Sequence, residues 1–369
     1  MESLIKMTQI DQQQIIYFPY LCFQYDLINF EGMILWNFDR ERNKLIPNTE
    51  VRNYIEKLLN ANTAYGRPLQ NMAVFSEKEP IFKFSRRKMK LATELRYILF
   101  LCVVADRNIH QGENAGHYMA TSENFTHVFQ NFKLGGEFTA ISSGSIVRKD
   151  DLGYEIGKVT YEKPPYVLQG NYRIDKALIA ALKAIKRRDR KAYRRILMSV
   201  DAFMGGYYNS HESSYESRIL QQSRAFEILL QLPEGKQRQF FKEKVKFYCL
   251  PRNKKFHRRI RYSSERPGGA RKTEVDIITV MWADRFYTLR NHIIHGDNIK
   301  KGDYFFKSQR HWDISLWVYL VIVKKIINES LGKRIFYDQI LWQNGRFEYD
   351  RGDIEKWVEK CSKKFQGRL

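Results

Sequence analysis

The chain has 369 residues, of which 43% are hydrophobic, so it can form a sizeable core and is long enough for two domains. Its 63 Lys and Arg residues exceed its 41 Asp and Glu residues, which gives a net charge of +22. Clustered cations at this excess favour a nucleic acid as partner over a protein that charge merely keeps soluble. The four cysteines form no CxxC pair, which disfavours a structural zinc site and fits reduced thiols.

The longest apolar segments, residues 97–105 and 314–323, are too short to span a bilayer. Residues 1–6 contain no apolar run of the kind found in signal peptides. We therefore expect a cytoplasmic protein that does not interact with a membrane.

Residues 1–165 have the pattern of a mixed α+β domain, for which we expect a sensor or regulatory role. Residues 14–38 are rich in aromatic and β-branched residues and predict two or three strands. Residues 49–61 place apolar side chains at helical spacing and predict a short helix. Residues 91–104 fit either a buried helix or a strand, and residues 112–172 predict further strands and loops.

After Pro164 and Pro165 the pattern becomes helical, and residues 172–345 predict an all-α bundle, which makes the whole chain α+β. The expected helices start near Tyr172, after Asp189, after Ser214, at residues 236–250, near Glu274 and at about residue 311. A polar, basic, glycine-containing insertion at residues 251–272 predicts a mobile loop. Residues 346–369 are expected to form a C-terminal tail or helix.

The most informative stretch is LRNHIIHGD, residues 289–297. Metal-free cleavage of RNA needs a base, an acid and a cation that stabilises the phosphorane. His295 can act as base or acid and Arg290 can bind phosphate oxygens. Five residues separate them, which on a straight helix offsets the side chains by about 140°. They would converge if the helix ended between them, and Gly296 is a predicted helix stop.

The spacing alone is weak evidence, because it recurs at Arg252 with His257 and, with a slightly longer interval, at Arg285 with His292. An Arg and a His at a helix C-terminus can also serve only to interact with the helix dipole. The stretch at Arg290 differs from the one at Arg252 in its place at the end of an apolar helix, directly before Gly296.

The segment FYTLRNHIIHGD, residues 286–297, resembles the signature of HEPN domains, in which an Arg, a polar residue and three further residues precede a His. The His-Gly pair after two apolar residues is similar to the Apea-like branch. The helix SRILQQSRAFEILL, residues 217–230, with Glu227 on an apolar face, also resembles that branch. The resemblance covers residues 172–345, and the insertion at 251–272 departs from it.

The resemblance implies that Arg290, Asn291 and His295 are catalytic, with Glu227 in support. His292 is an addition to the motif, and its place one turn after Thr288 predicts a supporting role in which it packs or caps the helix. It implies a homodimer in which two motifs face each other across a two-fold axis, so that each contributes one His. The implied activity is that of a metal-independent endoribonuclease that leaves a 2′,3′-cyclic phosphate and needs no cofactor. Such proteins act as toxic effectors in anti-phage, abortive-infection defence, under a regulatory partner or activating ligand.

One basic cluster alternates cations with aromatic rings, a pattern suited to single-stranded RNA. Its expected RNA-binding residues are Arg252, Lys254, Lys255, Arg258, Arg259 and Arg261, interleaved with Phe256, His257 and Tyr262. A second cluster, residues 186–195, is equally well explained as a solvated face. The alternative function is a non-catalytic HEPN-like module that binds RNA or protein. A metal-dependent nuclease has little support, because the acidic residues near Asp150 form no convincing ligand set.

Overall fold

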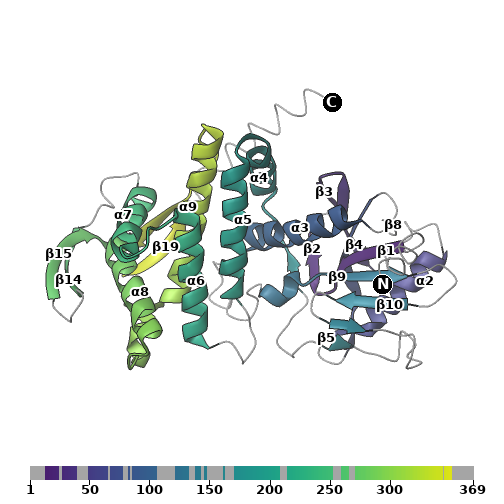
Figure 1. Ribbon diagram of the computed structural model, residues 1–369, viewed down its shortest axis with the longest axis horizontal. Helices are drawn as coiled ribbons and strands as arrows, with labels where there is room; N and C mark the ends of the chain where they lie inside the picture. The colour runs from purple at the N-terminus through teal and green to yellow at the C-terminus, as the bar shows by residue number, and fades with distance from the viewer. Residues whose placement is uncertain are drawn as a thin grey trace, which may run out of the picture. The chain divides into compact units, whose positions relative to one another are not determined.

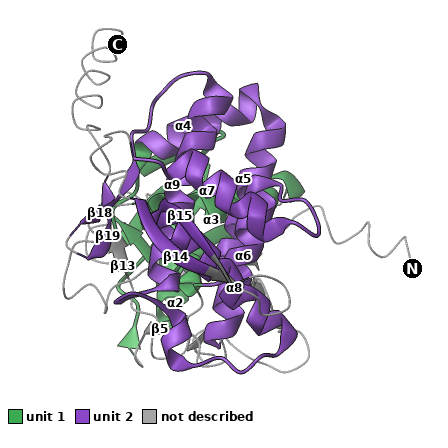
Figure 2. Ribbon diagram, turned by 90° about the vertical axis from the view of Figure 1, so that its left-hand side faces the viewer, with its two compact units in different colours: residues 1–176, 207–212 green, residues 177–206, 213–369 purple. Residues whose placement is uncertain are grey.

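The computed structural model shows a mixed α+β protein built from helices and mainly antiparallel strands (Figure 1). It describes residues 13–24, 27–39, 49–64, 67–77, 82–83, 85–105, 121–132, 138–142, 145–147, 161–162, 170–207, 214–251, 259–265, 271–343 and 345–350. The chain divides into two compact units, drawn in different colours in Figure 2. The first is Met1–Lys176 with Tyr207–Glu212, and the second is Ala177–Gly206 with Ser213–Leu369.

The first unit is centred on an antiparallel sheet with the strand order β11-β10-β9-β1-β7-β4-β3, in which β8 also pairs with β1. Its strands are β1 (Gln13–Phe18), β3 (Leu27–Phe30), β4 (Met33–Asp39), β7 (Asn71–Ser76), β8 (Phe82–Lys83), β9 (Val128–Phe132), β10 (Phe138–Ser142) and β11 (Ser145–Val147). Shorter pairings join β2 (Leu21–Phe23) to β13 (Gly170–Tyr172), and β5 (Asn62–Ala64) to β6 (Arg67–Pro68) and β12 (Tyr161–Glu162).

Residues 14–38 thus contribute to four strands rather than the two or three expected. A turn at Pro19 and Tyr20 separates β1 from β2, as the proline indicates. The additional division lies between β2, which ends at Phe23, and β3, which begins at Leu27. A second turn separates β3 from β4, and there both Glu31 and Gly32 have positive φ angles of 51° and 84°. Glycine adopts such angles without steric cost, which explains the tight reversal.

Two helices accompany the sheet, α2 (Thr49–Ala61) and α3 (Arg86–Val104). Helix α2 buries Ile55, Leu58 and Leu59 in one hydrophobic cluster with Ile15 and Tyr17 of β1. These alternate residues of β1 point to the same face of the sheet, because side chains in a strand alternate between faces. Residues 91–104, for which the sequence left helix and strand open, belong to helix α3. Residues 98–104 of this helix are all buried.

The second unit contains six described α-helices, a short 3-10 helix at Lys301–Tyr304 and three hairpins. Figure 1 shows most of these elements. The helices are α4 (Lys176–Arg188), α5 (Arg190–Gly205), α6 (Tyr215–Leu230), α7 (Gln237–Cys249), α8 (Ile278–His295) and α9 (His311–Leu331). Aromatic rings from five of them meet in the core. Tyr319 of α9 stacks on Phe203 of α5 with the ring centroids 4.0 Å apart, and Phe226 of α6 contacts Phe241 of α7 and Phe286 of α8.

The expectation of an all-α second domain is wrong, because three antiparallel hairpins belong to this unit. They are β14 (Arg259–Glu265) with β15 (Arg271–Ile277), β16 (Phe305–Phe306) with β17 (Gln309–Arg310), and β18 (Gln339–Gln343) with β19 (Arg346–Asp350). Of residues 251–272, residues 259–265 and 271–272 form strands of the first hairpin, where the sequence predicts a mobile loop, while residues 252–258 and 266–270 lie outside the described residues. The last hairpin replaces the start of the expected C-terminal tail or helix. Residues 351–369 lie outside the described residues.

Helix α8 begins at Ile278, later than the start near Glu274 that its apolar spacing predicts. Val275, assigned to the helical stripe from the sequence, instead lies on strand β15 and is 56% exposed. The apolar residues of β15 continue directly into those of α8, so spacing alone does not separate the strand from the helix.

Several helix ends follow from single residues that the sequence identifies. The carboxylate of Asp189 accepts the N–H of Ala192 and caps α5, and Ser214 caps α6 through the N–H of Ser217. Among the described helices, none combines the length and apolar character needed to cross a bilayer.

Candidate active site

The candidate site is built on the last two turns of helix α8. The helix runs without interruption through His295 and ends at Gly296, which adopts a left-handed conformation with φ 71°. The N–H of Gly296 bonds to the carbonyl of Ile293 and that of Asp297 to the carbonyl of His292. Since the helix ends after His295 and not before it, the expected convergence of Arg290 and His295 through a helix end between them is wrong. Within one chain their side chains diverge by about 140°.

Arg290 is held by a carboxylate of the neighbouring helix α6. Its Nη2 donates to Oε1 of Glu227 at 2.9 Å, and its Nη1 donates to Oδ1 of Asn291 at 3.1 Å. The hydroxyl of Tyr287 donates to the same Glu227 oxygen at 2.6 Å. The guanidinium also lies over the Tyr287 ring, 5.2 Å from its centroid. Arg290, Asn291 and Glu227 are therefore brought together, and Tyr287 joins them.

The environment of this cluster keeps the phenol protonated. Burial raises the pKa of Tyr287, and its hydrogen bond to the Glu227 carboxylate raises that pKa further. The Arg290 and Glu227 side chains are 20% and 26% exposed, so the ion pair is partly desolvated but open to solvent. The Arg290 Nε atom is buried and has no partner among the described residues. The guanidinium is thus fixed in direction while part of it stays accessible.

His295 is exposed in the last turn of α8. Within the part of the chain that the structure describes, its imidazole forms no hydrogen bond or ion pair with another residue, and it does not join the Arg290 cluster. His292 behaves differently, because its Nδ1 lies 2.6 Å from Oδ2 of Asp297 beyond the helix end. Of the two histidines, His295 is the one whose ring has no partner among the described residues.

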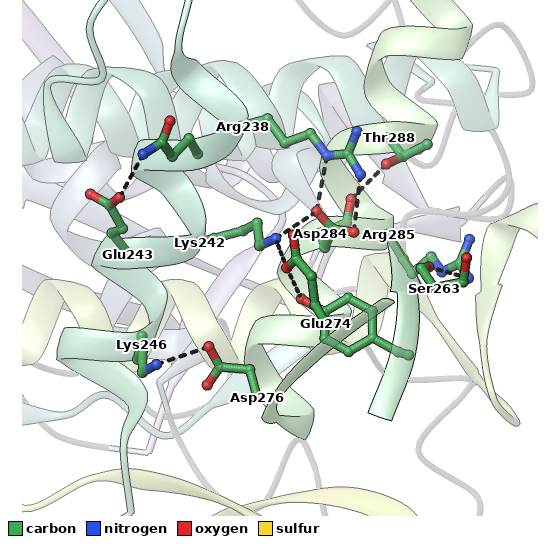
Figure 3. A network of polar contacts seen from close by, with 12 residues as sticks. Arg238, Lys242, Glu243, Lys246, Ser263, Glu274, Asp276, Asp284, Arg285 and Thr288 are labelled. Carbon is green, nitrogen blue, oxygen red and sulfur yellow. Dashed lines mark hydrogen bonds and ion pairs between the residues drawn. The ribbon is translucent and has the colours of Figure 1, made fainter. Parts of the chain in front are cut away.

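A buried ion network anchors α8 to its neighbours in the second unit (Figure 3). Arg238 of α7 donates Nε and Nη2 to the two carboxylate oxygens of Asp284 at 2.9 and 3.0 Å. Lys242 of α7 bridges Asp284, at 3.2 Å, and Glu274 of β15, at 2.5 Å. Asp284 is only 1% exposed, so its charge depends on these partners. The network ties α7, α8 and the β14–β15 hairpin together.

The expected RNA-binding cluster is described only in part. Arg259 and Arg261 are exposed on β14, and two residues apart on a strand they lie on the same face. Arg252, Lys254, Lys255 and Arg258, with Phe256 and His257, lie outside the described residues. Tyr262 is 5% exposed and its hydroxyl donates to Glu274, so it is not available to stack on a base, contrary to the expectation.

Three of the seven cations at residues 186–195 contact other side chains or a helix end. Arg188 donates to the carbonyl of Leu331 at the end of α9. Lys186 lies over the Tyr193 ring, and Arg195 donates to Gln231 at 2.6 Å. Arg187, Arg190, Lys191 and Arg194 are exposed, which fits both a solvated face and a face that binds nucleic acid.

Sequence analysis missed the part that Tyr287 plays in the site. The signal was its position three residues before Arg290, which places both on one side of a helix. It also missed that Asp284, in an otherwise apolar helix, needed a buried cationic partner. Among the described residues, no three His, Cys, Asp or Glu side chains are grouped as metal ligands would be.

Comparisons of the chain with protein-family models, characterised proteins and solved structures find no match. The HEPN resemblance therefore remains an expectation drawn from the motif. The function has to be inferred from the side chains and their surroundings.

Proposed function

We propose that the chain is a metal-independent endoribonuclease that cleaves single-stranded RNA, and that its second unit is a HEPN-like domain. The observation that supports this most is the presence of an oriented arginine and an exposed histidine in the last two turns of one helix. Arg290 is oriented by Glu227, and His295 stands exposed on the same helix, about 7.5 Å further along its axis. The net charge of +22 favours attraction of the polyanionic substrate.

In this proposal each group has a defined task. The neutral His295 imidazole takes the proton from the ribose 2′-hydroxyl, or in its protonated form gives one to the departing 5′-oxygen. The Arg290 guanidinium binds the phosphate oxygens and stabilises the charge that develops on the phosphorane. The 2′-oxygen attacks phosphorus as the bond to the 5′-oxygen breaks, which leaves a 2′,3′-cyclic phosphate.

One chain supplies one His295, while cleavage with both an acid and a base uses two. A two-fold dimer that joins the ends of two α8 helices would supply both. This accounts for an exposed His295 that has no partner within its own described chain. The first unit would then be the part that senses a regulatory partner or ligand, and a toxic role in anti-phage defence would follow from the activity.

A second candidate is a HEPN-like module that binds RNA or protein without cleaving it. The observation in its favour is that Arg290 already has a carboxylate partner, and the pair would have to open for Arg290 to bind phosphate fully. This candidate predicts RNA binding that weakens with salt and survives substitution of both Arg290 and His295.

The test is cleavage of an unstructured RNA in the presence of EDTA. The expected result is a cyclic phosphate product with the wild-type chain, and a fall in rate of about a hundredfold or more with His295→Ala or Arg290→Ala. Arg224→Ala is a matched control, because Arg224 is exposed on α6 and has no partner among the described residues. Cleavage that requires a divalent metal, or that persists in His295→Ala, would overturn the proposal.

A further inference from the structure

A cavity of about 500 Å³ lies beside α8, within the second unit. It is lined by Ser263, Met281, Arg285, Thr288, Leu289, His292, Asn298, Ile299, Gly302, Asp303, Phe305, Phe306, Lys307 and His311. The volume falls in the range of about 300–1,000 Å³ that is typical of small-molecule sites. The face of α8 that lines it is distinct from the face that carries Glu227's partners, Tyr287 and Arg290.

Two cations border the cavity without an acidic partner. Arg285 is exposed, and its one hydrogen bond among the described residues goes from Nη2 to the backbone carbonyl of Ser263 at 3.1 Å (Figure 3). Lys307 is exposed and forms no ion pair or hydrogen bond with the described part of the chain. The acidic residue in the lining is Asp303, whose Oδ2 accepts the N–H of Lys300 at 2.8 Å. Arg285 and Lys307 therefore leave most of their donors available to an anion.

Lys307 is held in place at a conformational cost. It sits in the turn between β16 and β17 with φ 59°, a left-handed conformation that few non-glycine residues adopt. A glycine would occupy this turn without strain. Lys307 thus lies beside the cavity at a position where the left-handed backbone conformation would favour glycine.

The remainder of the lining suits an uncharged ring. Phe305 is 37% exposed, and Phe306, Leu289 and Met281 add apolar surface. His311 is 2% exposed, and burial lowers its pKa to about 3, so the imidazole stays neutral. Its Nδ1 atom has no partner among the described residues.

We infer that this cavity binds a nucleotide, with Arg285 and Lys307 on the phosphate and the base against Phe305. Aromatic faces bind bases by stacking, and guanidinium groups bind phosphate through paired hydrogen bonds. Arg285 and His292 repeat the Arg–His pattern of the candidate active site, and the cavity offers an explanation for this second pair. Both residues lie seven positions apart on one face of α8, and both line the nucleotide site.

The nucleotide is either a free mononucleotide or one unit of an RNA strand, and two probes separate these sources. Binding of AMP and of a short oligoadenylate RNA is measured by calorimetry on the full chain carrying His295→Ala, so that RNA is not cleaved. A free nucleotide as ligand predicts binding of AMP, whereas a unit of RNA predicts binding of the oligonucleotide alone. Because binding is the readout, the result does not depend on the proposed nuclease activity.

Two variants test the assignment of residues. Arg285→Gln and Lys307→Gly should each weaken binding of the probe about tenfold or more, since each removes a charged donor. Lys307→Gly also relieves the turn, so loss of folding does not explain its effect. Arg224→Gln and Lys333→Gly remove exposed cations elsewhere and should leave the affinity unchanged. The inference is overturned if neither probe binds, or if both cavity variants bind as tightly as their controls.

Discussion

At the level of single residues, Glu227 fixes the orientation of the Arg290 guanidinium. One carboxylate oxygen accepts both the Arg290 guanidinium and the Tyr287 hydroxyl, so two donors on one helix share one acceptor on another. Because the pKa of Tyr287 is raised, its phenol stays protonated and remains a hydrogen-bond donor to Glu227. Arg290 is thus locked in direction by groups that are themselves constrained, which is what a phosphate-binding group needs before its substrate arrives.

His311 makes the stability of the second unit depend on pH. Burial lowers the pKa of His311 to about 3, so the unfolded chain binds a proton that the folded chain does not when the pH lies between about 6.5 and 3. The contribution of His311 to the free energy of unfolding is fully present above about pH 6.5. It falls as the pH drops, by about 1.4 kcal/mol for each pH unit. Denaturant unfolding at pH 7 and pH 5 measures this loss.

The variant His311→Phe should remove this contribution, because phenylalanine does not titrate and fits among Trp282, Phe286 and Phe306. His295→Ala, which changes an exposed histidine, should retain the full dependence. His127 in the first unit has a pKa lowered to about 4 by burial and acts in the same direction, so unfolding of the two units has to be followed separately. An equal pH dependence in His311→Phe and wild type would contradict this account.

At the level of elements, Asp284 joins α8 to α7 and the β14–β15 hairpin. Asp284→Ala would leave Arg238 and Lys242 without their buried partner, and we expect it to lower the free energy of unfolding by about 3–5 kcal/mol. The pair Lys246–Asp276 joins α7 to the same hairpin, but Lys246 is 52% exposed. Lys246→Ala should therefore cost less than about 1 kcal/mol. Chemical denaturation of both variants compares the two, and similar losses would show that the buried network does not anchor α8.

The sequence predicts the helices of the second unit because their signals are local. Asp189, Ser214 and Gly296 mark helix ends through hydrogen bonds or backbone angles that span only a few residues. The β14–β15 hairpin was not predicted, because its many charged residues are typical of a solvated loop. Its strands nevertheless alternate, with Arg259 and Arg261 exposed and Tyr262 buried, on either side of a Pro-Gly-Gly sequence that favours a turn.

At the level of the whole molecule, the candidate site shows where sequence reasoning stops. Arg290 and His295 are visible in the sequence, and Glu227 is found through a resemblance. That Arg290 bonds to Glu227 while His295 stays apart depends on how α6 packs against α8. The cavity depends on more distant pairings still, since Ser263, Arg285 and Lys307 meet there from three separate elements. Such contacts are set by the tertiary fold, and no short sequence pattern indicates them.

The exposed His295 and the divergence of about 140° between the catalytic groups make a two-chain site the central structural requirement of the proposed activity. If cleavage uses one His295 from each chain, a mixed dimer of wild type and His295→Ala lacks one of the two imidazoles and should be inactive. Excess His295→Ala protein, preincubated with wild type, should therefore lower the activity of the wild-type chains severalfold. RNA is kept in excess over total protein, so that sequestration of substrate cannot explain the fall. The same addition without preincubation is the control, and sedimentation measures dimer formation at the assay concentration. Activity that stays proportional to wild-type chains, while the two proteins form mixed dimers, would place the complete site within a single chain.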